Sequence, residues 1–277
     1  MNIRNFAMNL VLRLISLAFC YKDGGMDKEK LTQDQKDRMQ VKMPSTLEIW
    51  SYAYFGQGCL IGPFFEFSDF KRFIERSEEF KSFPSPVVPS LIVLGRSFVW
   101  LGVFVVGDMF FPIETCWSMK YYEFSFPYRV FYYWIALIIK RFFYYSPFTL
   151  VDAGAVSCGF GYNGTTEEKD KPPVAKWDRI VGMYVYNIET MKTPLIGMRD
   201  WNHMVHIWIK HYISGRLVGP GQKMGLKETM LVFFTMSYWH GFQPSIYIVF
   251  FFGGIMVELA RDLYRARYLF RGVPDWA

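Results

Sequence analysis

Long stretches without charged side chains alternate with short polar segments along this chain. The longest, residues 229–257, runs for 29 residues without Asp, Glu, Lys or Arg. A helix needs about 20 mainly apolar residues to cross the hydrocarbon core of a bilayer. The stretch therefore predicts at least one membrane-embedded helix, and it argues against the alternative interpretation, a large soluble helical core.

Five further segments carry at most one charged residue each. They are residues 5–21, 49–65, 97–113, 130–139 and 142–166. Several are too short or too interrupted for a straight span. We therefore predict an all-α, polytopic integral membrane protein with about six to eight membrane-embedded helices around an internal tunnel, all in one domain over residues 1–277.

The first apolar stretch could be mistaken for a secretion signal, since Arg4 precedes it. Arg13 lies within the stretch and no small-x-small cleavage site follows, so a first membrane helix is the better interpretation. A polar loop is expected over residues 22–45. Because every polar connection contains Lys or Arg, the positive-inside rule does not assign the orientation.

Composition supports these expectations and excludes other classes of protein. Aromatic residues make up 20 % of the chain and charged residues only 20 %, which excludes disordered, collagen-like and coiled-coil proteins. Lys and Arg number 31 against 25 Asp and Glu, for a net charge of +6. No basic run is dense enough to favour nucleic acid as a partner, so we expect lipid or an anionic substrate instead.

The four cysteines lie far apart in apolar surroundings, at positions 20, 59, 116 and 158. With no CxxC pair and no histidine at ligand spacing, they predict buried reduced thiols rather than a disulfide framework or a zinc site.

Ionisable groups within apolar stretches are costly and often functional. His240 is the only side chain of residues 229–257 that titrates near neutrality. Gly241 and Pro244 follow it, which predicts the end of a helix and a local break that can open a polar cavity. The plainer alternative is a histidine satisfied by one structural hydrogen bond.

The other three histidines lie in a segment that contains Asn202. A helix here would place Val205, Trp208 and Tyr212 on one face with Trp201, and Asn202 and His206 beside it. No Asp or Glu follows at ligand spacing, so we expect no metal. The alternative for this segment is an amphipathic helix that lies in the bilayer interface.

A short break separates the Asn202 segment from the His240 segment. Gly219, Pro220 and Gly221 mark it, 18 residues after Asn202 and 20 before His240, counted at Pro220. At about 1.5 Å per residue, two antiparallel helices would hold both side chains at nearly the same depth. We therefore expect an Asn/His hairpin over residues 198–241 whose two polar groups face one cavity.

These motifs resemble the membrane-bound O-acyltransferase family. Trp201 and Asn202, with Trp208 and Tyr212 downstream, are followed by Ser-Tyr-Trp-His-Gly at residues 237–241. Three further segments are similar to the lysophospholipid acyltransferase branch, namely residues 14–24, 44–65 and 152–161. The resemblance covers most of residues 8–270.

The resemblance implies the site and its chemistry. It implies that His240 and Asn202 are the catalytic pair, that acyl-CoA is the donor as a co-substrate with no cofactor bound permanently, and that the membrane is the endoplasmic reticulum. A lysophospholipid would be the acceptor. We assign Trp201, Trp208 and Trp239, which flank the pair, as candidate substrate-binding residues, and Lys210 and Arg216 as candidate contacts for the phosphates of CoA.

Two alternatives remain open at this point. The chain could be a relative that acylates a hydroxyl of a protein or a sterol, or a catalytically silent scaffold or lipid-binding protein. Members of this branch usually have additional membrane helices at both ends, so we expect this chain to be shortened relative to them. The oligomeric state has no signal in the sequence.

Overall fold

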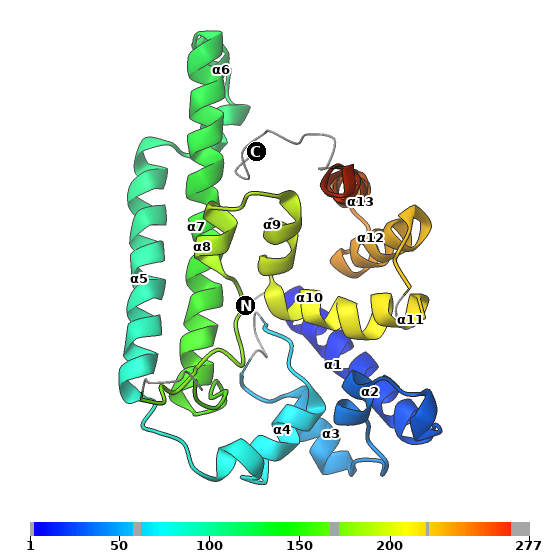
Figure 1. The fold of residues 1–277 in the computed structure, drawn as a ribbon. Coiled ribbons are helices and arrows are strands. Elements are labelled where there is room, and N and C mark those ends of the chain that lie inside the picture. The colour runs from blue at the N-terminus through cyan, green and yellow to red at the C-terminus, as the bar shows by residue number, and fades with distance from the viewer. Residues whose placement is uncertain (1–2, 58–61, 167–171, 220–221, 267–277) are drawn as a thin grey trace. The chain divides into compact units, whose positions relative to one another are not determined.

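A computed structural model describes residues 3–57, 62–166, 172–219 and 222–266, which form two compact units (Figure 1). One unit comprises residues 1–75 and 184–277, and the other residues 76–183. The regular elements among the described residues are all helices, joined by turns and loops with one isolated bridge between Thr165 and Ala175, which confirms the predicted all-α class.

Two long helices, α5 (Val87–Phe110) and α7 (Phe126–Ser157), run side by side and form the body of the second unit (Figure 1). The Ser97 hydroxyl donates to the Ser146 carbonyl at 2.8 Å. At Gly107 an added Cβ would lie 2.8 Å from Ile139, so the absence of a side chain lets the helices approach closely. Short elements complete the unit: η2 (Glu78–Lys81), η3 (Ile113–Trp117) and α6 (Met119–Glu123).

The outer surface of α5 is strongly apolar. Its exposed side chains include Val88, Leu91, Phe98, Val99, Val106 and Phe110. In the described part of the chain, the stretch Val87–Trp117 alone is long and apolar enough to cross a bilayer, and only 6 % of its apolar window is buried within the protein. The expected six to eight membrane-embedded helices are not confirmed by this measure.

The N-terminal helix α1 (Ile3–Gly24) organises the first unit. It packs against α2 (Gln33–Arg38), α3 (Thr46–Ala53) and α4 (Phe67–Ile74), with η1 (Lys28–Lys30) between α1 and α2. Residues 22–45, expected as a loop, therefore include the end of α1 and two short helical elements. Ser45 and Glu48 form a capping box that starts α3, as their i, i+3 spacing dictates.

Arg13, the single charge of the first apolar stretch, is fully buried. Its guanidinium donates to the carbonyls of Tyr52, Ala53 and Gln57 at 2.7–3.1 Å and lies 4.2 Å from the centre of the Phe65 ring. Carbonyls at a helix end lack partners within the helix. Arg13 satisfies the carbonyls of the last two residues of α3 and of Gln57 in the loop that follows, and so ties the end of α3 to α1.

The C-terminal part of the first unit is a series of shorter helices. They are α8 (Val185–Glu189), α9 (Pro194–Asp200), α10 (His203–Ile209), the π-helical segment η4 (Lys210–Ser214), α11 (Gly215–Leu217), α12 (Leu226–His240) and α13 (Pro244–Arg265). The pairs Phe233–Phe250 and Phe234–Tyr247 show that α12 and α13 pack antiparallel. The break expected at residues 219–221 falls between α11 and α12, with Pro220 and Gly221 outside the described residues.

The uncharged stretch 229–257 is thus two helices and not one. Helix α12 ends at His240, Gly241 adopts φ 119°, which suits glycine, and Pro244 begins α13. The predicted break is confirmed. Cys20 and Cys116 are buried as expected, whereas the prediction for Cys158 is wrong because this thiol is exposed near the end of α7. Cys59 lies outside the described residues.

Candidate active site

Two tryptophans join the segments that carry Asn202 and His240 to adjacent turns of α1 by hydrogen bonds. The Trp208 indole donates to the Leu12 carbonyl and the Trp239 indole to the Met8 carbonyl, both at 3.0 Å. Met8 and Leu12 are four residues apart, or one helical turn. Helix α1 therefore sets the position of α10 and of the end of α12 (Figure 1).

Asn202 occupies the corner between α9 and α10. Its backbone is left-handed, with φ 49° and ψ 57°, a conformation that Asn tolerates better than most residues. Its carbonyl accepts the first backbone hydrogen bonds of α10, from Val205 and His206. The helix expected to include Asn202 thus begins one residue later, at His203. The Asn202 side chain is half-buried, and its amide makes no hydrogen bond with the described residues.

A buried carboxylate holds this corner in place. Asp200 is 1 % exposed and accepts from Arg199 at 2.6 and 2.8 Å and from Asn187 at 2.8 Å, while its carbonyl accepts from the Tyr184 amide. The Arg199 guanidinium, helped by Asn187, lowers the pKa of Asp200. Sequence reasoning missed Asp200, although a carboxylate directly before a Trp-Asn pair was a visible signal.

His240 ends α12 in apolar surroundings. Its ring centre lies 4.8 Å from that of Trp239 and 5.0 Å from that of Phe250, and the residue is half-buried. The Arg4 guanidinium donates to its main-chain carbonyl. No hydrogen bond to a described residue engages the imidazole.

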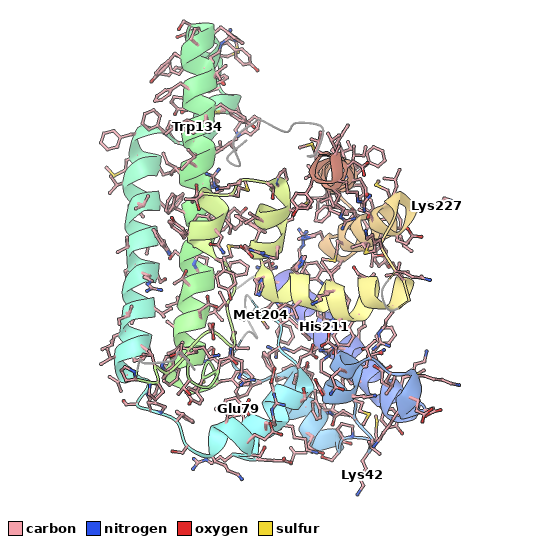
Figure 2. All side chains as sticks on the ribbon, viewed as in Figure 1. Lys42, Glu79, Trp134, Met204, His211 and Lys227 are labelled. Atoms are coloured by element: carbon pink, nitrogen blue, oxygen red, sulfur yellow. The ribbon has the colours of Figure 1, made fainter. Side chains whose placement is uncertain are left out.

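Two helical arms of equal length lead to the two polar groups: Asn202 directly precedes the first arm and His240 ends the second. Residues 203–217 and 226–240 each comprise 15 residues on either side of the break, and η4 packs against α12. Figure 2 marks the first arm by Met204 and His211 and the start of the second by Lys227. No hydrogen bond or ring contact joins Asn202 to His240 in the described structure, so the shared cavity stays a prediction.

The candidate substrate-binding tryptophans differ in their surroundings. Trp208 is 5 % exposed and Trp239 is half-buried. The indole N–H of each donates a hydrogen bond to a carbonyl of α1. Trp201 is 36 % exposed and precedes Asn202 at the end of α9. Of the three, Trp201 presents the largest surface to a ligand, and the other two position the helices.

The remaining histidines serve separate partners. His203 Nδ1 lies 3.2 Å from the Arg199 carbonyl and its ring packs edge-on against Tyr184, whereas His211 lies against Glu66. Burial is the main cause that lowers the pKa of His206, and the nearby charges of His203 and Arg199 lower it further. Among the described residues, no three His, Cys, Asp or Glu side chains gather into a group that could hold a metal ion.

The π-helical segment directs two consecutive side chains toward the buried carboxylate Glu66. The Tyr212 hydroxyl donates to one carboxylate oxygen, and His211 Nδ1 lies 3.3 Å from the other. Such single-turn π-segments often occur at functional sites because they redirect side chains. Glu66 was missed from sequence, since nothing local connects it to residues about 145 positions away.

The two candidate phosphate contacts also have different roles. Lys210 is exposed and lines a pocket of about 460 Å³ together with Arg38, His211, Ser214 and Gln222. Arg216 makes a bidentate ion pair with the buried Asp23, at 3.0 and 2.6 Å, and packs 4.3 Å from the Phe19 ring centre. Lys210 remains available to a ligand, and Arg216 ties α11 to the end of α1.

The His240 imidazole and the Asn202 carboxamide make no hydrogen bond with the described residues. An imidazole can accept a proton, and a carboxamide can stabilise a developing oxyanion. Comparison with known proteins bears on this chemistry. Residues 4–271 match the model of the membrane-bound O-acyltransferase family (MBOAT).

Curated relatives with related names are similar over almost the whole chain. Lysophospholipid acyltransferase of Saccharomyces cerevisiae is 27 % identical over 96 % of this chain and 46 % of its own length. Lysophospholipid acyltransferase 2 of Arabidopsis thaliana is 28 % identical over 93 % of this chain and 56 % of its own. Membrane-bound glycerophospholipid O-acyltransferase 2 of Mus musculus is 30 % identical over 92 % and 50 %. The chain spans about half the length of these relatives.

Proposed function

This chain belongs to the membrane-bound O-acyltransferase family, and on that premise we propose that it transfers an acyl group from acyl-CoA to the free glycerol hydroxyl of a lysophospholipid. We place this reaction in the membrane of the endoplasmic reticulum. The names of the relatives, lysophospholipid acyltransferase and glycerophospholipid O-acyltransferase, support a lysophospholipid acceptor over a protein or sterol hydroxyl.

One observation carries the proposal. Asn202 and His240 each end a helical arm, each keeps its polar side chain without a hydrogen bond to the described protein, and both arms are fastened to neighbouring turns of α1. Half-buried polar groups that make no hydrogen bond to the described residues are able to bind a ligand. Two such groups on segments held by one shared helix support a substrate-binding centre.

His240 acts as the general base in this mechanism. The hydroxyl of the lysophospholipid gives its proton to the imidazole as its oxygen attacks the thioester carbonyl. The C–S bond then breaks as the tetrahedral intermediate collapses, and the imidazolium returns the proton to the CoA thiolate. The base contributes about 10²- to 10⁴-fold in rate.

Asn202 stabilises the transition state. The carboxamide nitrogen donates to the thioester oxygen as negative charge develops on it, a contribution that grows in a site shielded from water. The left-handed backbone, fixed by the ion pair of Asp200 with Arg199, holds the amide in one orientation before substrate binds. Such preorganisation avoids the cost of reorienting the donor during the reaction.

Lys210 contacts the phosphates of the donor. Its ammonium is exposed at the edge of the pocket that Arg38 and His211 also line. Arg216 supports this region indirectly, because its guanidinium is held by Asp23.

The test measures acyl transfer by the protein in membranes that lack their own activity, with labelled oleoyl-CoA and a panel of lysophospholipids. His240→Ala should lower kcat by about 10²- to 10⁴-fold with little change in acyl-CoA binding. The exposed neighbouring variant Tyr238→Phe should behave as the wild type. Near-normal turnover by His240→Ala would refute its role as the base.

A further inference from the structure

We propose that Glu66 is a positioning residue for the acyl donor. Its buried carboxylate holds the segment η4, so that the Lys210 ammonium faces the pocket and contacts a phosphate of acyl-CoA. The inference rests on the proposed function, because it takes Lys210 as the contact for the donor. It adds a residue that touches neither substrate and yet sets how tightly the donor binds.

The Glu66 side chain does not cap the helix that it begins. Glu66 is the N-cap residue of α4, a position where side-chain oxygens commonly accept a hydrogen bond from a backbone amide of the first turn. Its carboxylate makes no such bond. The side chain is buried instead against a segment about 145 residues further along the chain. The carboxylate therefore serves the tertiary structure and not its own helix.

The carboxylate fixes the rotation of η4 about its own axis. The Tyr212 hydroxyl donates to one carboxylate oxygen of Glu66, and His211 Nδ1 lies 3.3 Å from the other. Because two consecutive side chains of η4 are held at one point, the direction in which the preceding residue, Lys210, leaves the backbone is fixed as well. Lys210 and His211 both line the pocket of about 460 Å³.

Glu66 also joins the two walls of this pocket. Arg38, at the end of α2, lines one wall, and its Nε lies 3.8 Å from the carboxylate oxygen that His211 approaches. Lys210 and His211 belong to the other wall. Glu66 itself is not among the described residues that line the pocket. It therefore acts on a ligand there only through the residues that it holds.

The charges of the pocket leave Lys210 as the group for an anion. A buried carboxylate is costly unless it is paired and hydrogen-bonded, and Glu66 faces Arg38 at one of its oxygens. His211 lies between two carboxylates, because its Nε2 is 3.9 Å from Asp34. Lys210 is exposed and makes no ion pair with a carboxylate of the described residues. Its charge is thus the one that a phosphate can neutralise.

The experiment measures kcat and the KM for oleoyl-CoA with the full chain, in membranes that lack their own activity and with saturating 1-oleoyl lysophosphatidylcholine. Glu66→Gln keeps the size of the side chain and removes its charge, so the KM for oleoyl-CoA should rise by roughly 10-fold, as for loss of a charge-assisted contact. The kcat should stay within roughly twofold of the wild type, because the change acts on donor binding. Glu66→Asp keeps the charge, and its KM should lie between those of the wild type and Glu66→Gln.

A double-mutant cycle with Lys210 separates positioning from a purely structural role. Lys210→Ala should by itself raise the KM for oleoyl-CoA by roughly 10-fold. If Glu66 acts through Lys210, Glu66→Gln in the Lys210→Ala background should raise the KM no further, because the effects of coupled residues do not add. Full additivity of the two changes overturns the inference.

Tyr212→Phe keeps the test decisive if Glu66→Gln does not fold. It leaves the carboxylate and Arg38 in place and removes the hydroxyl that donates to Glu66, so the KM for oleoyl-CoA should rise by roughly 2- to 10-fold, as for one hydrogen bond. Glu75→Gln is the matched control, since this exposed carboxylate ends the same helix and its recorded partner is Lys71, four residues earlier. Its kinetics should match the wild type.

The outcomes separate the two proposals. If Glu66→Gln folds with an unchanged KM for oleoyl-CoA, or lowers kcat alone, Glu66 does not position the donor contact. An unchanged KM in Tyr212→Phe leads to the same conclusion, and each of these results overturns the inference while the proposed function stands. A wild-type protein that acylates no lysophospholipid overturns the proposed function, and the inference with it.

Discussion

At Asn202 the backbone conformation is as important as the amide it presents. A left-handed backbone is unfavourable for residues with a Cβ, costing roughly 1–2 kcal/mol, but Asn and Gly tolerate it. The family resemblance pointed to Asn202, but the sequence did not predict this conformation, because the periodicity placed the residue within a helix. The corner contains the ion pair of Arg199 with Asp200, which Asn187 reaches only in the folded chain.

Two substitutions at Asn202 separate the backbone from the amide. Asn202→Gly keeps access to φ 49° and removes the carboxamide, whereas Asn202→Ala removes the amide and strains the backbone. We expect both to lose activity to a similar degree, and only Asn202→Ala to lose roughly 1 kcal/mol of stability. Thermal unfolding in detergent and acyl transfer, measured on the same preparations, check this. Full activity of Asn202→Gly would show that the amide has no catalytic role.

At the scale of elements, α1 is the helix on which the site is assembled. Its apolar stretch, with Arg13 inside it and no cleavage site after it, predicted a first membrane helix. Its contacts show a structural role, because it accepts hydrogen bonds from Trp208, Trp239 and Arg216. Sequence alone predicted the break after His240 because Gly241 and Pro244 are local signals. It did not predict the π-helical segment, because the side chains of that segment contact Glu66, which is distant in sequence.

Removing the indole N–H of Trp208 or Trp239 tests whether its hydrogen bond to α1 holds the segment that carries Asn202 or His240 in position. Trp208→Phe and Trp239→Phe keep an aromatic ring but lose the bonds to Leu12 and Met8. Each should cost about 0.5–1.5 kcal/mol of stability. The double variant should lose kcat more than it changes either KM, because the catalytic groups are displaced while the substrate sites remain.

Tyr238→Phe serves as the matched control, since its ring is largely exposed on the same helix. If the tryptophan variants keep wild-type kcat despite their loss of stability, the anchoring on α1 does not position the reactive groups.

At the scale of the molecule, the exposed apolar surface of α5 indicates a contact with lipid. Side chains such as Val99, 58 % exposed, would contact water if the protein were surrounded by it, and a large exposed apolar patch marks a membrane or protein contact. Membership in a membrane-bound family and the span Val87–Trp117 both identify lipid as that environment.

Cysteine accessibility tests the environment of α5 directly. In a background without native cysteines, Val99→Cys should be protected from a charged maleimide in permeabilised membranes, because a thiol in hydrocarbon forms no thiolate. Met43→Cys, at a position that is 62 % exposed in a polar segment, should be labelled. Equal labelling of the two cysteines would show that α5 faces water and is not a span.

The sequence by itself determined the features that depend on neighbours along the chain. The capping box of Ser45 and Glu48 and the break at Gly241 both follow from residues a few positions apart, whereas the roles of Asn202 and His240 stay a prediction from the family resemblance. Only the tertiary structure decided which groups meet across long separations, such as Arg4 with His240, Trp208 with Leu12 and Tyr212 with Glu66. Local hydrogen bonds are fixed by helical geometry, whereas these contacts depend on how helices distant in sequence pack against α1 and α4, which no local pattern specifies.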